Sequence, residues 1–319
     1  MMKNRKYIIM PMLLALLSVA TSCEQEELPP AVPDSDAVEV TATIGDAQDT
    51  RVSQPEDNKY VFDADDQIHI VGWTGNWDEY NKPWSDPTDT WWNDAVSTYN
   101  GYKWKTEPYM RWQNGDGLQH NFLAWWPEGF VKSDQDLTEI EITLTGDYKK
   151  DDILLARWTG ERPADNTLPL RFNHLLSRFD VHLFFRNEYT TYSDISIETK
   201  LKNTVKCNLM TGEVDAKSAT GDYVRMQARQ HPDDNYHWSG TCITVPHEFN
   251  GELLTIKFTG NGEEKTINYE HTGQLTFRSG QRTTLYLIVS KEKVELRDVF
   301  VTDWETAPDI DGGEAEEEI

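Results

Sequence analysis

VEVTATI, the sequence of residues 38–44, alternates apolar and polar side chains without a break. Successive side chains of a β-strand point to opposite faces, so this alternation indicates a strand with one buried face. Turn formers such as Gly260-Asn261-Gly262 separate the alternating runs. Short runs of this kind predict an all-β protein built from β-sandwiches. The pattern recurs in residues 68–70, 140–144, 179–183, 254–258, 285–289 and 299–301.

A polar stretch at residues 186–193 divides these runs into two groups. The half before it is rich in tryptophan, whereas the half after it holds only Trp238 and Trp304. We therefore predict two β-sandwich domains, residues 37–190 and 191–308, with a boundary placed to within about ten residues. A third segment, residues 309–319, is dominated by acidic side chains and is predicted to be a disordered tail.

The first 22 residues have the pattern of a signal peptide. Basic residues within positions 3–6 precede an almost wholly apolar run at residues 7–20. The run is shorter than the roughly 20 residues needed to cross a bilayer, but it fits a secretory leader. Small residues then lead into Cys23, as in the signals of bacterial lipoproteins. We predict an exported lipoprotein anchored in the membrane through acylated Cys23, with residues 23–36 as an acidic, proline-rich tether. Ordinary secretion with cleavage nearby is the alternative.

The composition argues against nucleic acid as a partner and against catalysis. The formal net charge is −25, and a phosphate backbone would repel such a surface. The sequence has no nucleophile elbow, P-loop, dinucleotide-binding or zinc-protease motif. His231 and His237 lie in a hydrophilic stretch without zinc-type spacing, which favours a solvated loop over a metal site. We predict no enzyme, no cofactor and no metal. Cys207 and Cys242 could pair or stay as free thiols, and both states remain open.

Nine of the twelve tryptophans lie between Trp73 and Trp126. Several of them sit among turn-forming residues without any alternation, and exposed flat rings on a loop can stack on sugar faces. The first interpretation is therefore a ligand-contacting surface for a glycan or a host-surface ligand. The alternative is that these rings cap the end of a sandwich core, because large aromatic side chains are usually buried. The candidate residues are Trp73, Trp77, Trp84, Trp91 and Trp92.

Six segments occur in an order that resembles the fimbrillin family, which comprises type V pilus subunits and related surface lipoproteins. This resemblance implies two tandem transthyretin-like sandwiches. The acidic residues that follow Cys23 resemble the surface-export signal of lipoproteins in the gut bacteria that carry fimbrillins. This resemblance implies an outward-facing location at the outer membrane. The segments are NDAVSTYNGYKW at 93–104, NFLAWWP at 121–127, DDILLA at 151–156, LPLRFNHLLSRF at 168–179, FRSGQRTTL at 277–285 and VTDW at 301–304.

The resemblance also implies assembly by donor-strand exchange. In that process a trypsin-like protease cuts after an arginine near the amino terminus, and a strand of a neighbouring subunit fills the groove that opens. Arg51 lies between the run at 38–44 and the next alternating run, where such a cut would fall; a plain surface arginine in a mobile connection is the alternative. The groove strand would place Val38, Val40, Ala42 and Ile44 in the core. Few alternating residues follow Trp304, so a donor strand, if the chain has one, would be residues 294–304 with Val299 and Val301 as anchors.

Together these patterns predict a non-catalytic fimbrial subunit or fimbrillin-like adhesin. It would be made as a lipoprotein precursor and assembled with other fimbrillin-like subunits at the outer membrane. The alternative is a monomeric surface lipoprotein that binds glycans through the tryptophan-rich segment.

Overall fold

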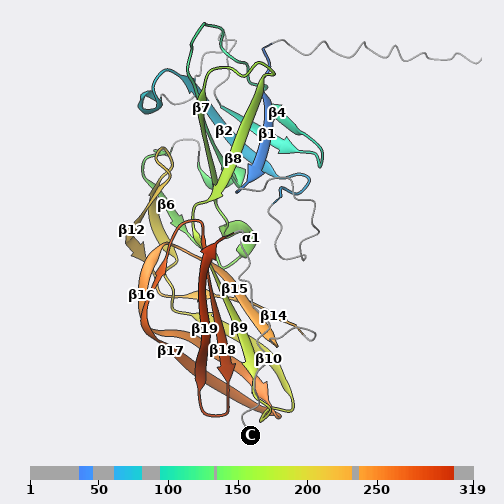
Figure 1. Ribbon diagram of the computed structural model, residues 1–319, viewed down its shortest axis with the longest axis vertical. Coiled ribbons are helices and arrows are strands. Elements are labelled where there is room, and N and C mark those ends of the chain that lie inside the picture. The colour runs from blue at the N-terminus through green and yellow to red at the C-terminus, as the bar shows by residue number, and fades with distance from the viewer. Residues whose placement is uncertain (1–35, 46–60, 81–93, 133–134, 232–236, 305–319) are drawn as a thin grey trace, which may run out of the picture. The chain divides into compact units, whose positions relative to one another are not determined.

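The computed structural model describes residues 36–45, 61–80, 94–132, 135–231 and 237–304 of the protein. The chain divides into two compact units, Met1–Ser35 and Asp36–Ile319, and every described residue belongs to the second unit. That unit consists almost entirely of β-strands (Figure 1), which confirms the all-β prediction. Among the described residues, no helix combines the length and the apolar character needed to span a bilayer.

Seven strands form the first sheet, in the order β1-β8-β7-β5-β2-β3-β4. Neighbours in this sheet are antiparallel except for β1, which runs parallel to β8. The short 3-10 helices η1 (Trp77–Glu79) and η2 (Glu128–Phe130) follow two of its strands. The strands are β1 (Glu39–Ile44), β2 (Gln67–Thr74), β3 (Asp94–Tyr99), β4 (Trp104–Glu107), β5 (His120–Trp126), β7 (Leu154–Gly160) and β8 (Thr167–His174).

A five-stranded and a four-stranded sheet pack face to face later in the chain. The five-stranded sheet has the order β14-β15-β9-β18-β19, and the four-stranded sheet has the order β13-β10-β16-β17. Phe179 and Leu285 from the first of these sheets and Ile197 and Ile256 from the second are fully buried in one shared core. The strands are β9 (Ser177–Phe185), β10 (Tyr192–Thr199), β13 (Val224–Arg225), β14 (Gln227–Gln230), β15 (Trp238–Thr244), β16 (His247–Gly260), β17 (Glu263–Phe277), β18 (Gln281–Val289) and β19 (Val294–Asp303).

A small third layer consists of β12 (Glu213–Thr220), β11 (Thr204–Asn208) and β6 (Ile140–Thr143), paired in that order. The one-turn helix α1 (Tyr148–Asp151) follows β6. Ile140 and Val205 of this sheet share a hydrophobic cluster with Trp73 and Trp125 of the seven-stranded sheet and with Ile243 of β15. The small sheet therefore packs against strands from both ends of the described chain.

The alternating runs fall on strands, as the sequence predicts, except that Val38 and Leu144 lie one residue outside β1 and β6. The turn signal at Gly260-Asn261-Gly262 lies between β16 and β17, the longest hairpin of the fold. Asn261 and Gly262 both have positive φ, 51° and 83°, as a two-residue type I′ turn requires. Asparagine and glycine adopt this conformation most readily, so the local sequence favours the hairpin.

Strand pairing crosses the predicted domain boundary near residue 190. β9 precedes that boundary, but it pairs with β15 and with β18, both of which follow it. The division into domains 37–190 and 191–308 stays a prediction. The signal peptide 1–22, nearly all of the tether 23–36 and the acidic tail 309–319 lie outside the described residues.

Candidate functional site

The leading strand, defined here as residues 36–45, includes β1, the terminal strand of the seven-stranded sheet. Val38, Val40 and Ile44 are all less than 10 % exposed, and Ala42 packs against the same cluster. The intervening side chains, such as Thr41, point to solvent. The core around these anchors includes Ile68, Ile70, Phe122, Leu168, Leu170 and Phe172. The alternation therefore has the meaning that the sequence suggests, with one face of the strand inside the protein.

Backbone hydrogen bonds hold the leading strand on both of its edges. Along one edge β1 pairs in parallel with β8, from Glu39 opposite Thr167 to Ile44 opposite Phe172. On the other edge, the Val38 N–H donates to the carbonyl of Met110 at 2.9 Å, and the Trp112 N–H donates to the carbonyl of Asp36 at 2.7 Å. An extended segment that completes a sheet in this way is bound by ladder hydrogen bonds and alternate side-chain pockets.

Two arginine side chains, one from the connection between β7 and β8 and one from β8, contact the two ends of the leading strand. At its start, Arg162 Nη1 lies 3.0 Å from Asp36 Oδ1. At its end, Arg171 Nε donates to the carbonyl of Gly45 at 3.0 Å. Neither arginine was predicted as part of the site, because each lies 126 residues from its partner along the chain and no local pattern marks such a contact.

The predicted donor strand is paired within its own sheet. β19 runs antiparallel to β18 along the edge of the five-stranded sheet, with Val299 opposite Leu285. Val299 is 42 % exposed and Val301 is 52 % exposed, so neither side chain is anchored in the core. Trp304 follows the strand and is buried, where its ring stacks on His174 at 4.0 Å. Donation of β19 to another subunit would require these contacts with β18 to break.

The tryptophan-rich segment is described in part. Trp73 is buried, and its indole N–H donates to the carbonyl of Asn76, so the prediction of a ligand-contacting ring is wrong for this residue. Trp77 is half-buried in the same cluster, where its indole N–H donates to the Met210 carbonyl and Arg157 lies 4.7 Å above its ring. Both rings are held by core packing, in line with the alternative interpretation. The remaining candidates, Trp84, Trp91 and Trp92, lie outside the described residues, as do Cys23 and Arg51.

Cys207 and Cys242 are buried free thiols in the structure. Burial raises the pKa of Cys207 to about 12 and raises the pKa of Cys242 well above its ordinary value. Since the thiolate is the reactive form, neither residue has the character of a nucleophile.

The two histidines considered as metal ligands have structural hydrogen bonds. His231 Nε2 lies 2.7 Å from Ser239 Oγ, and His237 Nδ1 accepts a hydrogen bond from the Phe185 N–H. In the part of the chain that the structure describes, no group of three or more His, Cys, Asp or Glu side chains could hold a metal ion.

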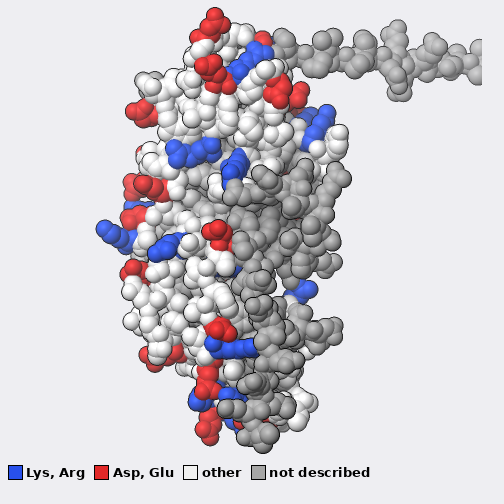
Figure 2. Space-filling view, in the orientation of Figure 1, with Lys and Arg blue, Asp and Glu red and all other residues white. Residues whose placement is uncertain are grey.

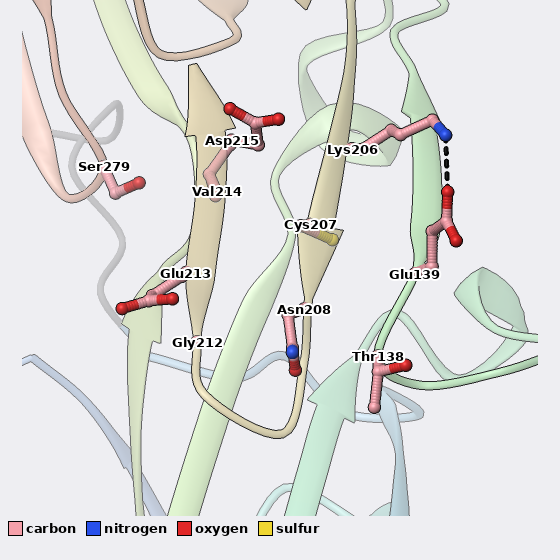
Figure 3. A pocket seen from close by; sticks show the side chains of 10 residues that line it. All are labelled: Thr138, Glu139, Lys206, Cys207, Asn208, Gly212, Glu213, Val214, Asp215 and Ser279. Carbon is pink, nitrogen blue, oxygen red and sulfur yellow. Dashed lines mark hydrogen bonds and ion pairs between the residues drawn. The ribbon is translucent and has the colours of Figure 1, made fainter. Parts of the chain in front are cut away.

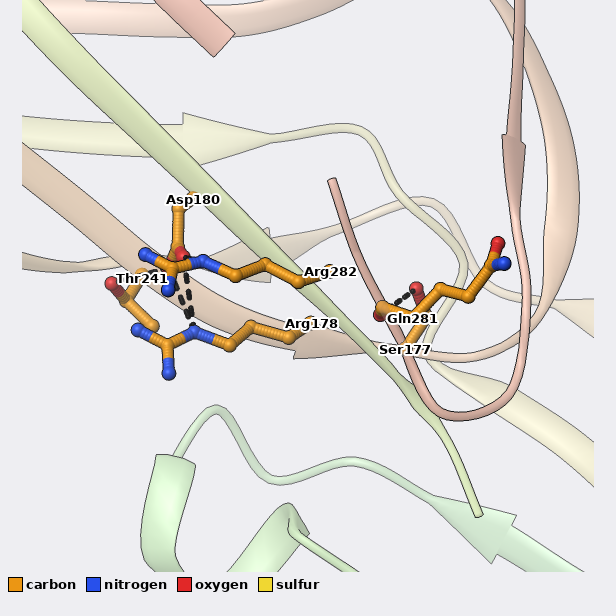
Figure 4. Close-up of polar contacts among 6 residues, drawn as sticks. All are labelled: Ser177, Arg178, Asp180, Thr241, Gln281 and Arg282. Atoms are coloured by element: carbon orange, nitrogen blue, oxygen red, sulfur yellow. Dashed lines mark hydrogen bonds and ion pairs between the residues drawn. The ribbon is translucent and has the colours of Figure 1, made fainter. Parts of the chain in front are cut away.

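A buried cluster of charged side chains lies on the five-stranded sheet (Figure 4). The Asp180 carboxylate binds Arg178 Nε at 3.0 Å, also forms an ion pair with Arg282, and accepts a hydrogen bond from Thr241 Oγ1 at 2.7 Å. Burial raises the pKa of Asp180, but the two guanidinium groups outweigh that effect and hold the pKa below its usual range. The sequence did not reveal this cluster, because its members come from three strands that are neighbours only in the folded sheet.

A surface cavity of about 770 Å³ lies along β11 and β12 (Figure 3). Most of its lining side chains are polar, including Glu213, Asp215 and the ion pair of Lys206 with Glu139. Small-molecule sites are mainly apolar with a few convergent polar groups, so this cavity does not have the character of an active site. On the face drawn in Figure 2, the described basic and acidic side chains are interspersed and form no broad basic patch.

Comparison with known proteins agrees with this architecture. The sequence profile of the fimbrillin-like family matches residues 50–304, so the chain belongs to that family. Family membership makes it a fimbrillin-like protein of the cell surface and not an enzyme. No curated protein sequence matches the chain significantly.

Two crystal structures illustrate the fold that it shares with known proteins. A candidate cell adhesion protein of Bacteroides uniformis is 18 % identical, with a TM-score of 0.58 over 84 % of this chain and 97 % of its own. A candidate cell adhesion protein of Bacteroides ovatus is 16 % identical, with a TM-score of 0.59 over 86 % of this chain and 99 % of its own. At this level of identity the likeness shows the fold alone.

Proposed function

We propose that the protein is a fimbrial subunit or fimbrillin-like adhesin that is assembled by exchange of its leading strand. The precursor would reach the outer membrane as a lipoprotein anchored through Cys23. A protease would then cut after Arg51 and release the lipidated segment together with β1. A strand of another fimbrillin-like subunit would fill the groove that opens.

The observation that carries this proposal is the way in which β1 completes its sheet. Its apolar side chains are core residues of the seven-stranded sheet, yet β1 is the terminal strand of that sheet. It is followed by residues 46–60, and Arg51 lies within that connection to β2. One cut there would leave β1 attached to the rest of the protein only by non-covalent contacts. A strand with the same pattern could then replace it without disturbing the covalent chain.

The extent of the family match supports the same division of the chain. The match begins at residue 50, next to Arg51, and ends at Trp304. The part of the chain that resembles the family is thus nearly the part that a cut after Arg51 would retain. β1 would belong to the released piece.

The test compares three chains in the bacterium that produces the protein: wild type, Arg51→Gln and Arg278→Gln. Arg278 is an exposed arginine outside the groove and serves as the matched control. Wild type and Arg278→Gln should lose the leading segment and appear in sheared surface fibres as multimers that resist detergent. Arg51→Gln should stay uncut, monomeric and attached to the membrane. Equal incorporation of Arg51→Gln into fibres would refute the proposal, and a monomeric wild type that binds a polysaccharide would favour the glycan-binding alternative.

A further inference from the structure

A polar network surrounds the start of the leading strand. Arg162, which lies between β7 and β8, donates from Nη1 to Asp36 Oδ1 and to Asn114 Oδ1, both at 3.0 Å. Its Nε donates to Asn166 Oδ1 at 2.8 Å. The side chains of Arg162 and Asp36 are each 28 % exposed, so water only partly screens their interaction. We call Asn114, Arg162 and Asn166 the head site.

The head site is built into the body of the protein rather than into the leading strand. Asn166 has a φ of 63°, and its carbonyl accepts hydrogen bonds from the Glu39 N–H and from the indole N–H of buried Trp112, both at 3.0 Å. The same residue therefore bonds the backbone of the leading strand and orients the guanidinium group of Arg162. Removal of the leading strand would take the Asp36 carboxylate away from Arg162, whereas Asn114 and Asn166 belong to the body of the protein and would keep their hydrogen bonds with Arg162.

The head site binds the leading strand two residues before the first side chain that enters the core. Asp36 precedes Val38, the first buried anchor, by two residues, and the other inward positions are Val40, Ala42 and Ile44. A shift of one residue in a strand would turn every inward side chain outward. A carboxylate held two residues before the first anchor therefore marks the one register in which the apolar side chains enter the core.

We propose that the head site is a carboxylate receptor that sets the register of the strand in the groove and selects the partner strand. This inference rests on the proposed function for the exchange of that strand. The partner is a strand of another subunit that runs in the direction of β1. Its inward positions follow the pattern acid, apolar, apolar, small, apolar, with one outward residue after each. Arg162 is a positioning residue in this scheme, because it contacts the strand that is exchanged.

The carboxy-terminal strand of this chain does not have that pattern. If this strand occupied the groove with Glu292 in the position of Asp36, Asp298 would occupy the position of Ala42. Its carboxylate would then point into the core. Each other acid within residues 292–303, placed at the head, likewise puts a polar or charged residue at an inward position. A buried, unpaired charge is strongly unfavourable. The partner strand therefore comes from a subunit of different sequence rather than from β19 of a second copy.

The experiment uses the full chain cleaved near Arg51 and a fluorescent synthetic peptide with the sequence of residues 36–45. The wild-type peptide should enter the groove, and an Asp36→Asn peptide should bind about tenfold more weakly, because the ion pair with Arg162 is replaced by a hydrogen bond to a neutral amide oxygen. A Glu39→Gln peptide is the matched control, since Glu39 is an exposed acid on the same strand. It should bind within about twofold of wild type.

The chain variant Arg162→Met completes a double-mutant cycle with these peptides. It should weaken binding of the wild-type peptide by about tenfold and abolish the preference for that peptide over the Asp36→Asn peptide. If the cleaved wild-type chain binds the wild-type and Asp36→Asn peptides equally well, the head site is refuted while strand exchange stands.

A second measurement covers the case in which no peptide enters the cleaved chain, an outcome that would refute strand exchange itself. Hydrogen exchange is then followed in the uncut chain, with and without Arg162→Met. The variant should speed exchange of the β1 amides about tenfold and leave those of β2 unchanged. Unaltered exchange in β1 would refute the head site independently of the proposed function.

Discussion

His182 lies on β9 beside the Asp180 cluster and stacks on Tyr286 at 4.7 Å. Burial lowers its pKa to about 4, although the nearby Asp180 acts in the opposite direction. An unfolded histidine titrates near its ordinary pKa of about 6.5, so between these two values the unfolded chain binds the proton and the folded chain does not. Stability must therefore fall as the pH is lowered through this window, by about 3 kcal/mol from this residue alone.

The variant His182→Phe tests that assignment, because it keeps an aromatic ring against Tyr286 and removes the titration. Urea unfolding is measured at several pH values from 7.5 to 4. The variant should lose about 3 kcal/mol less stability over this range than wild type. Other buried histidines, such as His120 and His247, also have lowered pKa values, so the unfolding free energy of both proteins should still decrease as the pH falls. If the unfolding free energies of the two proteins depend on pH to the same extent, the assignment is contradicted.

Asp180 shows how strongly one buried carboxylate can be required. It is 1 % exposed and is shared by Arg178 and Arg282. The change Asp180→Asn keeps the shape of the side chain but leaves two buried cations without their common anion, which should cost about 3 to 5 kcal/mol in unfolding free energy. Glu263→Gln, which breaks a surface pair of exposed Glu263 with Lys265, should leave the urea midpoint almost unchanged. A cost for Asp180→Asn no larger than that of this control would show that the cluster is solvated.

These residues also mark a limit of the sequence analysis. Alternation places Asp180 and His182 on the face of β9 opposite Phe179 and Val181, and on a two-layer sandwich that face is expected to contact water. In the structure both polar side chains are buried. The reason lies in long-range pairing: β9 and β18 are parallel neighbours, which brings Arg282 beside Arg178. Nothing near residue 180 in the sequence indicates a partner about one hundred residues later.

At the scale of elements, the contrast between β1 and β19 decides how each strand can be used. The apolar side chains of β1 are core residues, whereas Val299 and Val301 of β19 are largely exposed. The sequence predicts both strands from the same alternation, and that prediction is correct for their conformation. The sequence cannot predict which of the two strands is buried more deeply, because burial depends on what packs against each face of the strand. Edge position, parallel pairing and the arginine contacts at the ends of β1 are likewise properties of the assembled sheet.

The change Val40→Asp should release the leading strand without unfolding the body. It places an unpaired carboxylate in the core and should destabilise docking of β1 by about 3 kcal/mol, which corresponds to a roughly 100-fold larger open population. Cleavage near Arg51 by an arginine-specific protease should accelerate accordingly, because proteolysis follows the population of the open form. Thr41→Asp is the matched control, because Thr41 is the next residue along the strand and its side chain is exposed. If both variants are cut at the wild-type rate, the strand does not limit access to the connection.

At the scale of the whole described unit, one hydrophobic cluster joins the early and late sheets. Val71 and Leu123 of the seven-stranded sheet share it with Leu209, which follows β11, and with Val245, which follows β15. Two polar contacts reinforce this junction, from Trp77 to the Met210 carbonyl and from Arg157 to the Thr211 carbonyl. The sequence predicts two sandwiches but contains no signal for a shared core, since the residues that meet there are far apart along the chain. Two sheet regions that share a core of this kind should unfold together.

The change Leu209→Ala tests this cooperativity, because Leu209 is fully buried within the shared cluster. The cavity should cost about 3 kcal/mol, and urea unfolding can be followed by two probes. Most tryptophans lie in the first half of the chain, so fluorescence reports mainly on the seven-stranded sheet. The thiol of Cys242 lies in the core of the later sandwich and should react with a labelling reagent only after that core opens. Both midpoints should fall by the same amount in Leu209→Ala, and neither should move in Lys217→Ala, which changes an exposed residue of β12. If the fluorescence midpoint falls while the labelling midpoint stays unchanged, the two regions unfold separately. Loss of the shared contact would then destabilise only one of them.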